Sequence, residues 1–203
     1  LMETAKERAE EFAKDSKRPG DAKGVELTPL KREINGDEVN YSNISVQIDR
    51  AGLTAEITVR GPGQAPEQDA TAIHAAGVDF WPLAFAREFD DLILHMRSNE
   101  NEITTWVFKS EGNADFVEAG DAALLNNADD WLVREITNYI KRTFKRLDVS
   151  SRSVITLVEP GSCFTGTLME LVLAADRSFM LDGTFEGSNV AAATLRPTHM
   201  NFG

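Results

Sequence analysis

The sequence contains little of what metal sites, disulfides and membrane spans require. Its 203 residues include one cysteine and three histidines, and no Cys/His spacing typical of a zinc site is present. We therefore expect no bound metal and no internal disulfide, as is usual in a reducing compartment. No apolar run reaches the ~18 residues of a membrane span. The charged start, LMETAKERAEEF, contains no apolar signal region. Together these absences predict a cytoplasmic protein that has no membrane partner.

Basic residues are also few. The chain has 21 Lys and Arg against 33 Asp and Glu, which gives a formal net charge of −12. Most of such a surface repels a phosphate backbone, so nucleic acid is not an expected partner. Hydrophobic residues make up 42% and charged residues 27% of the chain, as in ordinary globular proteins. The length suffices for one domain with a substantial core.

Apolar periodicity predicts an alternation of helices and strands. Helices are predicted over 2–16, over 81–99, from near Gly120, from Asp130 towards Arg146, and in the segment 159–178. Strands are predicted at 43–49, 54–60, 102–109, 153–161, 177–181 and 189–195, the first two as a hairpin, and 61–71 as a polar loop. This order predicts an α/β layered fold. The continuous apolar run at 153–161 predicts a strand in a covered sheet.

Two segments join a strand to a helix through small residues, at 106–124 and 153–171. The free N–H groups at a helix start suit an anion or a developing oxyanion. Two such starts that converge on one thioester carbonyl would form an oxyanion hole. Any α/β domain has several such turns, however, and ordinary connections remain the alternative interpretation.

Both segments resemble the crotonase (enoyl-CoA hydratase) superfamily, in which two peptide N–H groups hold the thioester oxygen of an acyl-CoA. The stretch GTLMELVLAAD keeps Gly166, Glu170 and Asp176 of the superfamily's second segment. The stretch FVEAGD keeps the aspartate of the first segment and has Gly120 at the donor position. The resemblance implies a crotonase-like sheet flanked by helices, preceded here by a short β-meander and an N-terminal helix.

Longer motifs narrow the resemblance to one family. The stretches at 75–100, 105–114, 146–153 and 159–171, among them RLDVSSRS and EPGSCFTGTLMEL, are similar to the benzoyl-CoA-dihydrodiol lyases. That family cleaves the ring of 2,3-dihydro-2,3-dihydroxybenzoyl-CoA and releases formate in aerobic benzoate degradation. The resemblance therefore implies an acyl-CoA thioester substrate and no separate cofactor, because CoA is part of the substrate.

The resemblance also implies a domain organisation. Family members are longer and contain two crotonase-like halves, of which the first has the better-preserved catalytic site. The resemblance assigns residues 1–22 to the end of a preceding crotonase-like module and residues 23–70 to a β-meander or linker. It assigns residues 71–203 to a second crotonase-like domain, which we expect to be truncated at its C-terminus. The expected partners are the N-terminal half of the same protein and further copies in a homo-oligomer.

Two hypotheses follow for this chain. In the first, the N–H groups of Gly120 and Gly166 polarise a thioester, Thr167 competes with Gly166 for the second donor position, and Glu170 moves a proton. In the second, which we prefer, the chain is a structural half and Glu170 is a structural carboxylate. Threonine and leucine replace the loop glycines of true hydratases, and His199 replaces their second glutamate.

Other reactive side chains have simpler interpretations. Cys163 lies near a helix start but is interpreted as a buried apolar filler. All three histidines, His74, His95 and His199, are expected at the surface. Three tryptophans are expected in the core rather than around an acyl pocket: Trp81, Trp106 and Trp131. Four basic residues are attributed to a solvated helix C-terminus rather than to CoA phosphates: Lys141, Arg142, Lys145 and Arg146.

Overall fold

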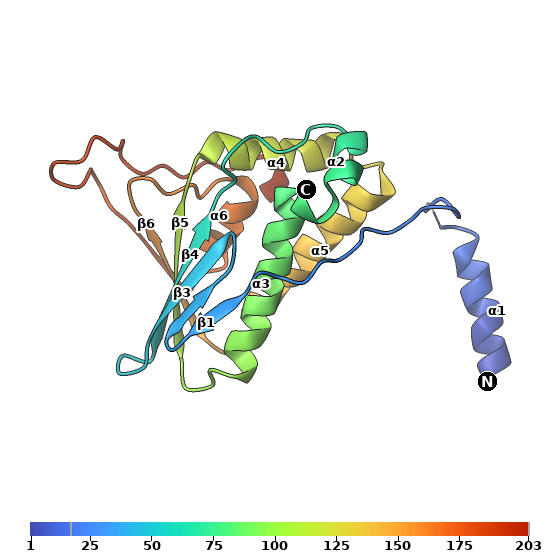
Figure 1. The fold of residues 1–203 in the computed structure, drawn as a ribbon, viewed down its shortest axis with the longest axis horizontal. Coiled ribbons are helices and arrows are strands. Elements are labelled where there is room, and N and C mark those ends of the chain that lie inside the picture. The colour runs from blue at the N-terminus through green and yellow to red at the C-terminus, as the bar shows by residue number, and fades with distance from the viewer. Residues whose placement is uncertain (17, 203) are drawn as a thin grey trace.

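A computed structural model describes residues 1–16 and 18–202 and confirms the α/β class (Figure 1). The strands form a seven-stranded sheet in the order β1-β2-β3-β4-β5-β6-β7. They are β1 (Glu33–Asn35), β2 (Glu38–Asn40), β3 (Ile44–Asp49), β4 (Thr54–Arg60), β5 (Thr105–Glu111), β6 (Ser153–Val158) and β7 (Arg177–Met180). The helices are α1 (Met2–Ala13), α2 (Ala70–Ala76), η1 (Gly77–Asp79), α3 (Trp81–Ser98), α4 (Ala114–Asn126), α5 (Trp131–Asp148), α6 (Gly166–Leu173) and η2 (His199–Asn201).

The first half of the sheet is an antiparallel meander. The predicted hairpin is confirmed: β3 and β4 pair in register from Ile44 opposite Val59 to Asp49 opposite Thr54. Strands β1 and β2, which were not predicted, extend the meander outwards. Because β4 also pairs with β5, the segment 23–70 and the region from residue 71 onwards share one sheet.

The second half of the sheet is parallel, and its helices lie on one face. Helices α2, η1 and α3 connect β4 to β5, helices α4 and α5 connect β5 to β6, and α6 connects β6 to β7. These crossovers all step in the same direction, so connections of one handedness place their helices on the same side. Figure 1 shows α3 to α6 gathered on that side of the strands.

The opposite face of the sheet is only partly covered. Strand β6 alternates between buried residues and the half-buried Ile155 and Leu157. The predicted apolar strand is therefore fully buried at alternate residues and partly exposed at the others, because the helices lie on one face of the sheet.

Aromatic side chains fill the core between the sheet and α3. The rings of Phe85 and Phe89 stack with centroids 5.4 Å apart, and Phe89 contacts Phe108 of β5 edge-on at 5.9 Å. Trp106 is fully buried and Trp81 nearly so, which confirms the core prediction for both. Trp131 is half-buried and packs against the neighbouring cluster under α5.

Two helix starts and one strand prediction need correction. Helix α4 begins at Ala114 rather than near Gly120, because Asn113 caps it by accepting a hydrogen bond from the Asp115 N–H. Helix α2 begins within the predicted loop, where Asp69 caps it. The segment 189–195 is not a strand.

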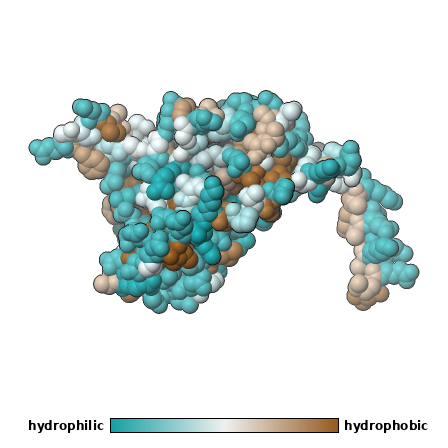
Figure 2. Space-filling view, viewed as in Figure 1, coloured by the Kyte–Doolittle hydropathy of each residue, from teal (hydrophilic) through white to brown (hydrophobic). Residues whose placement is uncertain are grey.

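Helix α1 lies apart from the rest of the chain. None of its residues is buried, and it projects from the body in Figure 1. In Figure 2 one side of this helix is pale brown and the other is teal, as the amphipathic repeat predicts.

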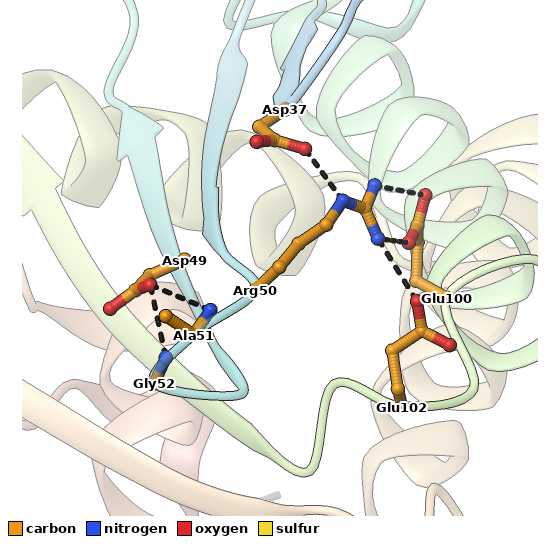
Figure 3. A network of polar contacts seen from close by, with 7 residues as sticks. All are labelled: Asp37, Asp49, Arg50, Ala51, Gly52, Glu100 and Glu102. Atoms are coloured by element: carbon orange, nitrogen blue, oxygen red, sulfur yellow. Dashed lines mark hydrogen bonds and ion pairs between the residues drawn. The ribbon is translucent and has the colours of Figure 1, made fainter.

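An exposed ion-pair network joins three connections at one end of the sheet (Figure 3). Arg50, in the β3–β4 turn, donates to Asp37 of the β1–β2 turn at 2.7 Å. It also donates to Glu100 at 2.8 Å and Glu102 at 3.1 Å, both in the loop before β5. These carboxylates raise the pKa of the Arg50 guanidinium, chiefly through its hydrogen bond to Glu100.

Candidate functional site

The candidate site lies where α4 meets the N-terminus of α6. Asp121 of α4 is buried, with 3% of its surface exposed. Its carboxylate accepts hydrogen bonds from the backbone N–H of Thr167, at 2.7 Å, and from the Thr167 hydroxyl. A carboxylate of the protein itself therefore occupies the anion-binding end of α6.

The neighbouring N–H groups at this helix start are also paired. The Gly166 N–H donates to the carbonyl of Arg196 at 3.2 Å. The Leu168 N–H donates to the carbonyl of Thr165 at 3.0 Å. The first three N–H groups of α6 thus all have partners within the protein.

The contact between the start of α6 and Asp121 requires a residue without a side chain at position 166. Its φ angle is +46°, a region that side-chain-bearing residues rarely adopt. A Cβ placed on Gly166 would lie 1.8 Å from the Asp121 Oδ2 atom. The glycine therefore makes room for an internal carboxylate.

Gly120 is not at a helix start. It is the seventh residue of α4, where a backbone N–H is directed at the carbonyl four residues earlier in the same helix. A Cβ at Gly120 would lie 3.4 Å from Pro82 and 3.5 Å from Pro66, so its lack of a side chain serves packing. The expected donor pair of Gly120 with Gly166 or Thr167 therefore presents no free N–H in this structure.

Glu170 lies one turn further along α6 and is half-buried. Its Oε1 atom accepts a hydrogen bond from the Asn201 side-chain amide at 2.6 Å. The same amide donates to the Gly166 carbonyl at 2.9 Å. Asn201 belongs to η2, whose capping box with Thr198 orients it. Through this hydrogen bond, Glu170 connects η2 to α6.

Burial dominates the electrostatics of Asp121. Removal from water raises the pKa of its carboxyl to about 6, although the Thr167 hydrogen bonds act in the opposite direction. The nearby carboxylates of Glu118 and Glu170 raise it further. The site therefore contains three acidic groups, of which Glu118 is paired with Arg196 at 3.1 Å, and the remaining two disfavour another negative charge.

Cys163 and two histidines behave as predicted, whereas the third histidine does not. The Cys163 thiol is fully buried, which raises its pKa, so it is the apolar filler expected. His74 and His199 are exposed. His95 is buried, and its Nδ1 lies 2.9 Å from the Asn99 amide, which corrects the surface prediction. Among the described residues no group of three His, Cys, Asp or Glu side chains is arranged to hold a metal.

A pocket of about 380 Å³ opens beside the site. Thr167 and Glu170 line it from α6, and Lys141 and Lys145 line it from α5. The other members of the predicted basic cluster are engaged elsewhere. Arg142 lies over the Tyr139 ring, and Arg146 pairs with Asp90 at 2.7 Å. The two lysines of the cluster therefore line the pocket, whereas the two arginines contact other side chains of the protein.

Comparison with known proteins tests the resemblance. Over 196 residues the chain is 45% identical to the benzoyl-CoA-dihydrodiol lyase of Aromatoleum evansii. The chain is related to this lyase. The similarity covers 97% of the chain but 34% of the benzoyl-CoA-dihydrodiol lyase, so the chain spans about a third of its relative's length. The resemblance that the motifs indicated is confirmed over nearly the whole chain.

Comparisons with family models and with solved structures give two further results. No family model matches the chain. The crystal structure of an enoyl-CoA hydratase from Geobacillus kaustophilus superposes with a TM-score of 0.46 and 15% sequence identity, over 70% of this chain and 47% of that one. Within the described residues, no helix combines the length and the apolar character needed to cross a bilayer.

Proposed function

We propose that this chain is one part of a crotonase-superfamily lyase that acts on an aromatic CoA thioester, and that this part is structural rather than catalytic. The proposal for the whole enzyme rests on the 45% identity to benzoyl-CoA-dihydrodiol lyase. By that analogy its substrate is 2,3-dihydro-2,3-dihydroxybenzoyl-CoA. The chemistry belongs to the rest of the polypeptide, and this part contributes to packing and subunit association.

One observation supports the structural role: the backbone N–H of Thr167 already donates a hydrogen bond to the Asp121 carboxylate. An oxyanion hole works only when its donors are free and aimed at the position of the developing negative charge. Here the donor is occupied, and a thioester oxygen would have to displace a buried carboxylate. That oxygen would also develop its charge next to Asp121, with Glu118 and Glu170 nearby, and like charges at close range oppose this.

Calorimetric titration with benzoyl-CoA tests the proposal, with free CoA as the control ligand. We expect no saturable heat beyond that of CoA, and no formate release from the dihydrodiol thioester. Glu170→Gln should give the same result as the unchanged protein, since Glu170 has a structural partner in Asn201. Saturable binding of benzoyl-CoA that Glu170→Gln weakens would contradict the structural role and favour the catalytic hypothesis.

A further inference from the structure

The pocket between α5 and α6 combines an apolar wall with two lysines. Ile140 and Phe144 of α5, Leu173 of α6 and Met200 of η2 supply apolar surface. The volume of about 380 Å³ falls in the range of roughly 300–1,000 Å³ that small-molecule sites occupy. Its position at the lower end of that range suits a molecule of one or two rings rather than a cofactor.

The lysines give the pocket one cationic side. Lys141 and Lys145 are four residues apart on α5, so they project from the same face of the helix. Both lysines are exposed, and among the described residues neither forms an ion pair, although the chain carries a net charge of −12. Two unpaired ammonium groups one turn apart form a favourable site for a single anionic group.

The acidic groups of the pocket determine which way an anion would lie. Glu170 lines the α6 side, where one of its oxygens is already held by Asn201, and Asp148 lines the end of α5. Both repel an anion, so its negative end is directed to the lysines and its apolar body to Phe144 and Leu173.

From this arrangement we infer that the pocket binds a small apolar anion, an aromatic or aliphatic molecule with one carboxylate or sulfonate, held by Lys141 and Lys145 with its body against Phe144. The site uses none of the N–H groups at the start of α6. It therefore does not rest on the structural role proposed above, and it requires neither CoA nor a thioester.

The test is a fluorescence titration of the 203-residue protein with 8-anilinonaphthalene-1-sulfonate, an apolar aromatic anion. We expect saturable binding at one site. The anion 2-naphthoate should displace the dye, whereas its uncharged counterpart 2-naphthamide should not. The double substitution Lys141→Gln with Lys145→Gln should weaken binding about tenfold or more, because it removes both charge-assisted contacts.

A charge-matched control separates the pocket from the general surface. The pair Lys31→Gln with Arg142→Gln removes the same charge outside the pocket and should leave affinity unchanged. Ala174→Trp, at an exposed position on the pocket wall, should block the site without disturbing the core. Absence of saturable binding, equal displacement by 2-naphthamide, or binding that neither the lysine pair nor Ala174→Trp affects would overturn the inference.

Discussion

Replacement of Asp121 by asparagine measures how much the ionisation of this buried carboxyl group lowers the stability of the fold. Asparagine keeps the size of the side chain and an oxygen that can accept from the Thr167 N–H, but it never ionises. The substitution therefore separates the charge of Asp121 from its shape and hydrogen bonds. A difference between the two proteins that depends on pH then reports the titration of this one group.

The sign follows from the direction of the shift. Burial raises the pKa of Asp121 from 3.8 to about 6, so between these values the folded protein binds more protons than the unfolded chain. The free energy of unfolding is then highest below pH ~4 and falls as the pH rises towards ~6, above which this contribution is constant. Two pKa units correspond to about 3 kcal/mol. Relative to the unchanged protein, Asp121→Asn should gain about that much between pH 4 and pH 7.

Urea unfolding at several pH values, followed by tryptophan fluorescence, measures this difference because Trp106 is fully buried. The exposed Asp129→Asn supplies the baseline for loss of one carboxylate. The reasoning is refuted if the difference curve for Asp121→Asn is flat across this range. It is also refuted if the curve has the opposite slope, which would mean that the ionised carboxylate stabilises the fold.

Three further results are expected. Gly166→Ala should destabilise the fold by about 2 kcal/mol or more in urea unfolding, because it combines a positive φ with a Cβ at 1.8 Å from Asp121 Oδ2, whereas the open Gly20 should tolerate alanine. Phe108→Ala should cost about 3–5 kcal/mol in the same assay, since the ring is fully buried; a loss under about 1 kcal/mol would contradict its place in the core. Cys163 should react with a thiol reagent at pH 8 only after urea unfolding, because burial raises its pKa and blocks access; fast reaction in the native protein would contradict both.

Long periodic segments could be predicted from the sequence because their pattern is local. Helix α3 repeats its apolar residues over five turns, and β3 and β4 alternate cleanly, so each was placed within a few residues. Strand β1 could not be predicted, because it has three residues that are all exposed. The predicted start of α4 near Gly120 is wrong although a local signal exists, because Asn113 is a good N-cap residue.

The candidate site was predicted only in part, for a related reason. The spacing of Gly166, Thr167 and Glu170 along one helix is a local pattern, and the sequence placed these residues together. The contact between Asp121 and Thr167 spans 46 residues, and the contact between Glu170 and Asn201 spans 31. No periodicity encodes such contacts, because they arise when separate helices pack.

The order of the strands bears on how the chain is made. Strand order in the sheet is the same as order along the chain, from β1 to β7. During synthesis each strand therefore emerges from the ribosome next to a neighbour that has already been completed, and no strand has to insert between two that are already paired. The connections between parallel neighbours are helical throughout, with three helices before β5, two before β6 and one before β7. Each new strand thus adds to the C-terminal edge of the sheet, while β1 remains its opposite edge throughout.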